Sequence, residues 1–342
     1  MLKANYHKYI LKFNFPAGTS RGVLNEKVSW FIDLYDDSYP EIIGRGECSL
    51  IKGLSPDPEI GYEEMLARVC SGPERFLSSP EPELNSFPSI RFGLEMARQD
   101  LIEGGKAVLF KSAFTDGQAG IPINGLIWMG SKQNMLKQIK QRIDEGFTCI
   151  KMKIGALEFE EELDLLGTVR KEFHQDLLQL RVDANGAFSP DEALEKLKRL
   201  SDFHLHSTEQ PIKPGNWKAM AALCKKSPLP IALDEELFAP EADGNKQNLL
   251  KSIKPQYLVL KPSMLGGFTK TQEWIDAANS MNIDWWITSA LESNIGLNAL
   301  AQWTCTLNNP VHHGLGTGKL FVNNLPGKLF VENGYLKFNQ KP

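Results

Sequence analysis

The sequence has no long apolar run and few cysteines. No window approaches about 18 consecutive apolar residues, the length that a membrane helix needs. The opening segment MLKANYHKYILKFNF alternates polar with apolar residues, unlike a secretion signal. The five cysteines are odd in number and scattered, with no Cys-x-x-Cys pair, which argues against zinc or redox chemistry. We therefore expect a cytoplasmic protein with reduced, mostly buried thiols.

The sequence also has no large excess of positive or negative charge. The formal net charge is −4 and 23% of the residues are charged, so there is no basic excess for nucleic acid. The pair His312 and His313 is explained more simply by the half-buried strand PVHHGLG than by a metal site. We expect a small-molecule carboxylate substrate and no nucleic-acid or membrane partner; the sequence leaves monomer and homo-oligomer open.

The N-terminal third predicts a small mixed domain. Residues up to about 50 alternate between apolar and polar before tight turns, which is typical of strands. Segments 60–72 and 87–104 repeat apolar residues at three- and four-residue spacing, which is typical of helices. A sheet followed by helices forms a separate α+β unit, which we assign to residues 1–115. The tail, 320–342, has strand and turn character and is expected to return to this unit.

From 116 to 319, short β-rich runs alternate with amphipathic helices. The candidate strands are PINGLIW, TCIKMKI, LQLRVDA, HLHSTEQ, PIALDEE, YLVLKPS, DWWITSA and PVHHGLG. Eight strand-plus-helix units are what a closed parallel barrel requires. The sequence therefore predicts an α/β fold, a modified (β/α)8 TIM-type barrel with an N-terminal α+β capping domain.

Charged residues close five of these apolar runs at intervals of 25 to 30 residues. They are Lys153, Asp183, Glu209, Asp234 and Lys261. The C-terminal ends of barrel strands meet at one mouth, so these side chains are expected to form one site. An acidic residue taken singly is more readily explained as a helix N-cap, but three at matching strand ends favour a metal site. Carboxylate oxygens alone favour Mg²⁺, with Mn²⁺ as a possible substitute, over zinc.

Two lysines share one face of a predicted strand. Lys151 and Lys153 are two residues apart, so both point the same way. We expect their mutual repulsion and a nearby cation to lower an ammonium pKa towards values that suit a general base. The alternative is a solvated basic strand, which the flanking Ile150 and Ile154 disfavour. Lys261 could act from the opposite side, or be a surface lysine that opens a loop.

With these residues, the chain resembles the enolase superfamily, in the muconate-lactonising-type subgroup marked by a Lys-x-Lys strand. The resemblance implies a capping domain, completed by the C-terminal tail, over a modified barrel. It implies that Lys153 and Lys261 face each other across a substrate and that Lys151 belongs to the catalytic set. The carboxylates Asp183, Glu209 and Asp234 would bind Mg²⁺, with Asn185 and Glu235 supporting them from beside the ligands.

Within the subgroup, SALESNIGLNALAQW and HGLGTGKLF are similar to the o-succinylbenzoate synthase family. This similarity implies elimination of water from 2-succinyl-6-hydroxy-2,4-cyclohexadiene-1-carboxylate in menaquinone biosynthesis. Lys153 would remove the proton next to the carboxylate and Lys261 would stay cationic. A lid loop with Ser20, Arg21 and Gly22 and the mouth residues Ser289, Asn294, Gly316 and Thr317 would contact the substrate, although ordinary loop chemistry explains them equally well.

Other functions fit parts of the pattern. N-succinylamino acid racemases and dipeptide epimerases of the same superfamily share the metal site and both lysines. The epimerases generally carry Asp-x-Asp at the eighth strand, which GLGTG lacks. A Schiff-base aldolase using Lys261 leaves the three carboxylates unexplained, and a non-catalytic barrel leaves the whole set unexplained.

Overall fold

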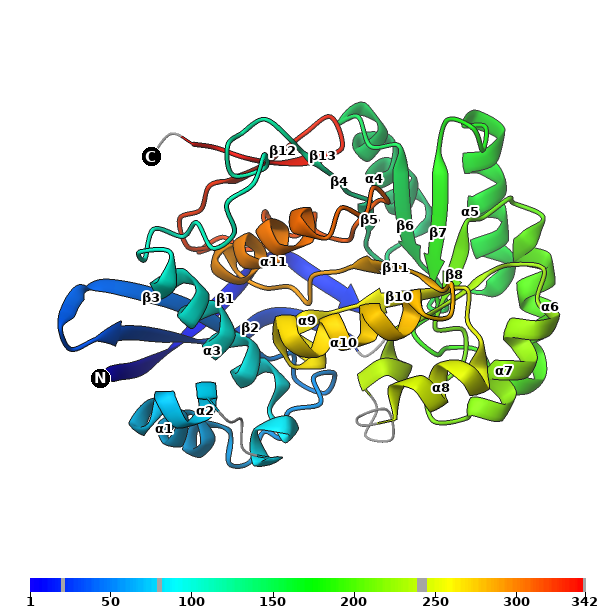
Figure 1. Ribbon diagram of the computed structural model, residues 1–342. Coiled ribbons are helices and arrows are strands. Elements are labelled where there is room, and N and C mark those ends of the chain that lie inside the picture. Colours follow the sequence, from blue (N-terminus) through cyan, green and yellow to red (C-terminus); the bar gives the residue numbers. More distant parts are fainter. Residues whose placement is uncertain (20–21, 79–81, 239–244, 341–342) are drawn as a thin grey trace.

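The computed structural model describes residues 1–19, 22–78, 82–238 and 245–340 (Figure 1). Its N-terminal part is an antiparallel sheet in the order β1-β2-β3, followed by helices. The strands are β1 (Leu2–Thr19), β2 (Gly22–Asp36) and β3 (Tyr39–Ser49). The helices are α1 (Tyr62–Ser71), α2 (Pro73–Ser78), the 3-10 turn η1 (Pro82–Ser86) and α3 (Pro88–Ile102).

Helix α3 lies directly on strand β3 because glycines face each other there. A Cβ atom at Gly46 would lie 1.8 Å from the carbonyl oxygen of Gly93, so neither position has room for a side chain. The close approach buries alternate residues of β2, such as Ile32 and Leu34, against Ile90 of α3. These contacts give the N-terminal sheet its own hydrophobic core.

A carboxyl group is buried beneath this core. Asp57 accepts hydrogen bonds from the backbone N–H of Ser89 (3.0 Å) and from its hydroxyl (2.7 Å), while its second oxygen has no partner among the described residues. Burial raises the pKa of Asp57 to about 7, although the bonds from Ser89 oppose the shift. The folded protein therefore holds this proton more tightly than the unfolded chain does.

We expect Asp57→Asn to remove a pH dependence from stability. The contribution of the proton is fully present below about pH 4 and is lost as the pH rises through 7, a loss of up to ~4 kcal/mol for a shift of about three units. When the pH is raised from 4.5 to 8, the difference in stability between the two proteins should therefore shift in favour of the variant. Urea unfolding at both pH values measures this; equal differences at the two values would contradict it.

The second part is a parallel sheet of seven strands in the order β11-β10-β9-β8-β7-β6-β5. The strands are β5 (Gly125–Ile127), β6 (Cys149–Lys153), β7 (Gln179–Asp183), β8 (Ser207–Glu209), β9 (Ile231–Leu233), β10 (Tyr257–Leu260) and β11 (Asp284–Ile287). The helical elements are α4 (Lys132–Asp144), α5 (Phe159–Glu172), α6 (Pro190–Ser201), α7 (Trp217–Lys226), η2 (Glu235–Phe238), α8 (Lys246–Ile253), α9 (Pro262–Leu265), α10 (Gly267–Asn279) and α11 (Asn294–Thr306). The order confirms the predicted α/β barrel class.

The barrel closes through an irregular segment where the sequence predicts an eighth strand. His313 bridges to Ile123, and Gly314 bridges to Thr288 just beyond β11, both in parallel. A Cβ atom at Gly314 would lie 2.6 Å from the Thr288 hydroxyl oxygen, so the two segments meet too closely for a side chain there. In the described chain, PVHHGLG thus joins both edges of the sheet by single bridges.

The C-terminal tail contacts both parts of the molecule. Strand β12 (Leu329–Glu332) pairs with β13 (Tyr335–Phe338), and β13 pairs with β4 (Ile121–Pro122), at the start of the barrel. Just before them, Phe321 forms a bridge with Phe13 of β1. The tail therefore ties the N-terminal sheet to the barrel, and the exact domain boundaries stay a prediction.

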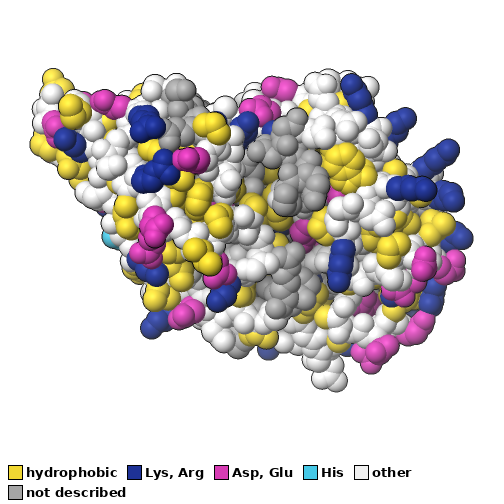
Figure 2. All heavy atoms as spheres, turned by 90° about the horizontal axis from the view of Figure 1, so that it is seen from below, with side chains coloured by type: hydrophobic (Ala, Val, Ile, Leu, Met, Phe, Trp, Pro, Cys, Tyr) yellow, Lys and Arg dark blue, Asp and Glu magenta, His cyan; other side chains and the backbone are white. Residues whose placement is uncertain are grey.

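The surface carries no single dominant charge on the face shown in Figure 2. Acidic, basic and hydrophobic side chains lie side by side there, in keeping with the small net charge. None of the helices in the described ranges has the length and apolar character needed to span a membrane.

Candidate active site

The strand register brings the predicted charged residues together. Lys153 at the end of β6 pairs with Asp183 at the end of β7, and Asp183 pairs with Glu209 at the end of β8. Asp234 directly follows β9 and Lys261 directly follows β10. All three carboxylates are buried, so their charges have to be balanced within the site.

Two buried lysines supply most of that balance. The Lys151 ammonium lies 2.6 Å from both carboxylate oxygens of Glu209 and 2.9 Å from Asp183 Oδ2. Lys261 donates a hydrogen bond to Asp234 Oδ2. Lys151 therefore joins two neighbouring strand ends.

Lys153 has a different position, with its amine at the cavity. It donates to Asn185 Oδ1 (2.6 Å) and to Asp183 Oδ2 (3.2 Å). Asn185 has a φ of 44°, a left-handed conformation that asparagine tolerates well, and its side-chain amide donates to Glu235 Oε1 (3.0 Å). The predicted supporting residues Asn185 and Glu235 thus orient the lysine amine.

The charges shift the ionisation of the cluster. Burial lowers the pKa of Lys151, but Asp183, Glu209 and Asp234 outweigh burial and raise it well above its usual range. The pKa of Lys261 is raised in the same way, chiefly by Asp234 against the effect of burial. Lysine repulsion alone therefore does not lower the pKa of Lys151, because carboxylates surround its ammonium.

The carboxylates divide between two behaviours. Burial raises the pKa of Glu209 to about 8, helped by the negative charge of Asp183. Burial likewise raises the pKa of Asp234. For Asp183, the lysines overcome burial and hold the pKa far below its usual range. Glu209 and Asp234 are thus protonated more readily than free carboxyl groups, whereas Asp183 keeps its negative charge.

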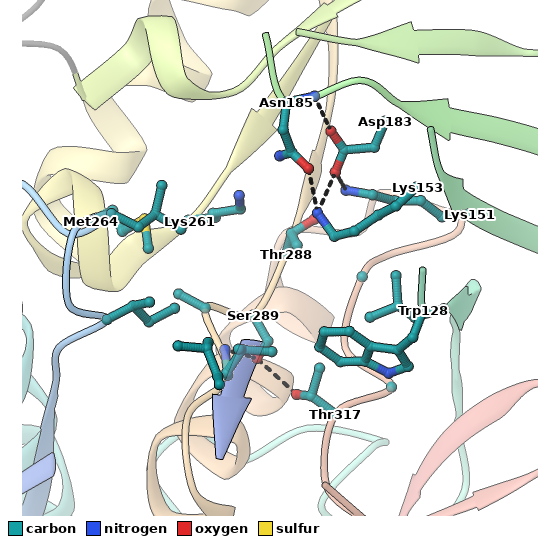
Figure 3. A pocket seen from close by; sticks show the side chains of 18 of the residues that line it. Trp128, Lys151, Lys153, Asp183, Asn185, Lys261, Met264, Thr288, Ser289 and Thr317 are labelled. Carbon is teal, nitrogen blue, oxygen red and sulfur yellow. Dashed lines mark hydrogen bonds and ion pairs between the residues drawn. The ribbon is translucent and has the colours of Figure 1, made fainter. Parts of the chain in front are cut away.

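A cavity that is open to solvent lies over this cluster. Lys153 and Lys261 reach towards it from opposite sides (Figure 3). Lys151, Asp183, Asn185 and Glu235 also line it, whereas Glu209 and Asp234 lie outside its lining. Much of the rest is apolar, formed by Leu24, Ile51, Leu54, Leu126, Trp128, Met264, Ala290 and Leu291. The arrangement offers an ionic floor beneath apolar walls, which suits a carboxylate attached to a carbon skeleton.

The predicted substrate-binding residues have different places in the structure. Ser289, Gly316 and Thr317 line the cavity. Asn294 does not; its side-chain amide donates to the carbonyl of Leu325 (2.5 Å). Gly22, at the start of β2, is also absent from the described lining. The predicted lid residues Ser20 and Arg21 lie outside the described residues.

Several wall residues were not predicted from the sequence. Leu126 and Trp128 alternate at and just beyond the end of β5, the first barrel strand, which is the same level as the predicted charges. Their alternation was the available signal. Ile51 and Leu54 come from the N-terminal part, and the sequence offers no spacing that places them at the barrel mouth.

Comparisons with known proteins agree with this geometry. A model of the family described as enolase C-terminal domain-like matches residues 134–342. The o-succinylbenzoate synthase of Desulfotalea psychrophila is 47% identical, and the match covers 98% of this chain and 98% of that protein. The chain belongs to the enolase superfamily.

Two further matches are a solved structure and an epimerase. The crystal structure of MenC from Desulfotalea psychrophila has a TM-score of 0.84 at 43% identity, covering 98% of this chain and 99% of its own. A hydrophobic dipeptide epimerase from a Flavobacteria bacterium is 26% identical, over 89% of this chain and 86% of its own length. Enolase-superfamily enzymes in general depend on Mg²⁺.

The donor set fits such an ion chemically. Asp183, Glu209 and Asp234 offer only hard oxygen ligands, and the buried Asp234 Oδ1 has no hydrogen-bond partner among the described residues. Within the described ranges, no three acidic, histidine or cysteine side chains form a ready-made metal site. Instead, Lys151 lies between two of the three carboxylates. Metal binding would thus require the Lys151 ammonium to move out of the space between these carboxylates.

Proposed function

We propose that the chain is an o-succinylbenzoate synthase, a lyase that eliminates water from 2-succinyl-6-hydroxy-2,4-cyclohexadiene-1-carboxylate to give 2-succinylbenzoate for menaquinone biosynthesis. The observation that carries the proposal is the placement of Lys153. Its amine is held by Asp183 and Asn185 at a cavity lined also by Lys261, in a chain 47% identical to an o-succinylbenzoate synthase.

We propose that Asp183, Glu209 and Asp234 hold Mg²⁺, or Mn²⁺ in its place, with Asn185 and Glu235 supporting them. When bound, the ion supplies positive charge for the substrate carboxylate as it gains electron density. The apolar walls keep water away from the reacting carbon. Cytoplasmic localisation remains a prediction.

Lys153 carries both proton transfers in this scheme. As a neutral amine it takes the proton from the carbon next to the carboxylate, and the bonding electrons move into the carboxylate. These electrons then return to form the aromatic ring, the carbon–oxygen bond breaks, and the leaving hydroxide takes the proton from Lys153 as water. The amine is regenerated, so atoms and charge balance. Lys261 stays an ammonium and offsets the negative charge of the intermediate.

A second candidate is racemisation of an N-succinylamino acid. The observation that favours it is the approach of Lys153 and Lys261 to the cavity from opposite sides (Figure 3), since racemisation needs an acid and a base on opposite faces of one carbon. Exchange of the α-proton in heavy water would detect this activity directly.

We expect dehydration to depend completely on the ion. Mass spectrometry of the cyclohexadiene carboxylate should show loss of one water with protein and Mg²⁺, no loss above a protein-free control with EDTA, and recovery when Mg²⁺ is added back in excess. Activity that persists at full rate in EDTA would remove the metal from the account. Absence of loss in every sample would remove the synthase function itself.

A further inference from the structure

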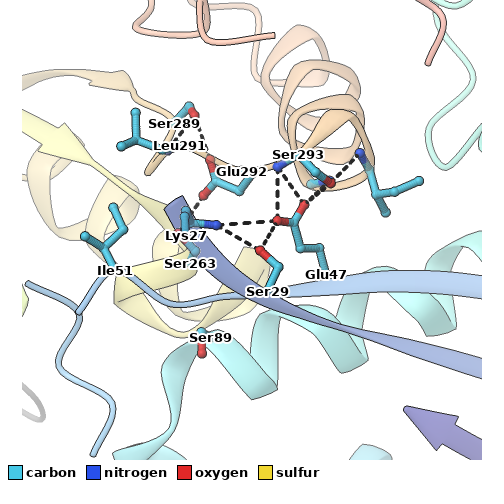
Figure 4. Close-up of polar contacts among 12 residues, drawn as sticks. Lys27, Ser29, Glu47, Ile51, Ser89, Ser263, Ser289, Leu291, Glu292 and Ser293 are labelled. Atoms are coloured by element: carbon cyan, nitrogen blue, oxygen red, sulfur yellow. Dashed lines mark hydrogen bonds and ion pairs between the residues drawn. The ribbon is translucent and has the colours of Figure 1, made fainter. Parts of the chain in front are cut away.

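A buried polar network joins the N-terminal sheet to the barrel beside the cavity (Figure 4). We call it the interface network. From β2 and β3 it contains Lys27, Ser29 and Glu47; from the barrel it contains Ser263, Ser289, Glu292, Ser293 and Thr317. Every member is buried, and three of them are ionisable. The proposed chemistry uses none of these three groups.

Glu47 fixes the sheet to the start of helix α11. Its carboxylate accepts from the backbone N–H of Ser293 (2.9 Å), from the Ser293 hydroxyl (2.5 Å) and from the backbone N–H of Gly296 (3.0 Å). These N–H groups at a helix start have no partner within the helix, and a negative charge there is favourable. A residue of the sheet thereby caps a barrel helix.

Lys27 supplies the positive charge of the network. Its ammonium donates to Ser29 Oγ (2.9 Å) and lies 3.6 Å from Glu47 Oε1. Burial lowers the pKa of Lys27, while the charges of Glu47 and Glu292 act to raise it. Lys27 therefore forms an ion pair with Glu47 and also offsets part of the charge of Glu292, so its removal would leave buried negative charge uncompensated.

Glu292 carries the network to the cavity wall. It accepts hydrogen bonds from the hydroxyls of Ser263 (2.6 Å) and Ser289 (2.7 Å). When Glu292 is ionised, Ser289 gives its one hydroxyl proton to Glu292, and the 2.8 Å contact with Thr317 then requires Thr317 to donate. The Ser289 oxygen also accepts from the backbone N–H of Leu291 (3.1 Å). Ser289 therefore has no donor left for a ligand.

We propose that Lys27 and Glu292 are positioning residues that set the hydrogen-bonding direction of this cavity wall. While Glu292 is ionised, Thr317 points its proton at Ser289 and presents its lone pairs to the ligand. The N-terminal sheet thus completes the cavity from a distance, and Ser289 acts through Thr317. This inference rests on the proposed function for its kinetic test.

The kinetic test compares Lys27→Met with the wild type in the dehydration assay. We expect KM to rise about tenfold while kcat changes less than about threefold, because the wall contacts the ligand in ground and transition states alike. In a Thr317→Val background, Lys27→Met should raise KM less than about twofold. If Lys27→Met raises KM by the same factor in the Thr317→Val background as in the wild type, the two residues act independently and the proposed coupling is overturned.

Two further variants separate positioning from stability. Leu66→Ala weakens the core of the N-terminal part without touching the network, and is expected to keep the wild-type KM at temperatures where it is folded. Glu292→Gln keeps the shape of the side chain and removes its charge. If Lys27→Met does not fold, this variant decides, and an unchanged KM in it would overturn the proposal.

Hydrogen exchange tests the coupling without any substrate. Peptides covering residues 289–296 should lose protection in Lys27→Met or Glu292→Gln and keep it in Leu66→Ala. Unchanged protection in the charge variants would overturn the proposal even if the enzyme is active. A wild type that fails to dehydrate the diene would instead defeat the proposed function, and the exchange result would still decide the coupling.

Discussion

Replacing Lys153 with alanine is expected to lower kcat for the dehydration by about four orders of magnitude. The amine is the group that the structure holds at the cavity through Asp183 Oδ2 (3.2 Å) and Asn185 Oδ1 (2.6 Å). Both proton transfers of the proposed reaction use it, so its loss removes the base and the acid together. Steady-state kinetics with saturating Mg²⁺ measure the effect.

Lys153→Arg is the matched control for charge. A guanidinium keeps the positive charge but does not give up its proton in proteins, so this variant should be nearly as inactive as the alanine variant. Recovery of a large part of the activity by arginine would show that Lys153 contributes charge and not proton transfer. Unfolding curves close to wild type would show that the losses are chemical.

The second large effect is expected at Lys151, in stability. Lys151→Met should destabilise the metal-free protein by ~3–5 kcal/mol, because Glu209 is then buried without its ammonium partner and Asp183 keeps only Lys153. If these carboxylates also bind Mg²⁺, the ion can replace the missing charge. The stability lost in EDTA should therefore be partly regained when Mg²⁺ is added.

Urea unfolding with and without Mg²⁺ tests this compensation. The control is Lys196→Met, which removes an ammonium from the partly exposed pair with Glu192 on helix α6. That change should cost no more than about 1 kcal/mol, with or without the ion. If Mg²⁺ fails to stabilise Lys151→Met more than it stabilises the wild type, the carboxylates do not form the metal site.

The sequence predicts the barrel because strand-end charges recur at the length of one strand-plus-helix unit. The register of Lys153, Asp183 and Glu209 agrees with this expectation, since parallel strands of similar length end at one level. The roles of these residues remain proposals. The sequence predicts a strand at PVHHGLG, whereas the described chain there makes single bridges at His313 and Gly314.

Long-range packing explains what the sequence did not reveal. The cavity walls at Ile51 and Leu54 depend on how the N-terminal part sits on the barrel, which no local spacing records. The same is true of Glu47, whose partner Ser293 lies 246 residues away. The raised pKa of Lys151 follows from three carboxylates on other strands. Only the folded chain brings these groups together.

The most direct test of the account is proton NMR of the wild-type protein with Mg²⁺ and the cyclohexadiene carboxylate in heavy water. A parallel sample holds an N-succinylamino acid, and a third holds the diene without protein. The account predicts that the diene signals give way to the aromatic protons of 2-succinylbenzoate faster than in the protein-free sample. Diene signals that persist as they do without protein, while the amino acid loses its α-proton signal, would contradict it and identify a racemase instead.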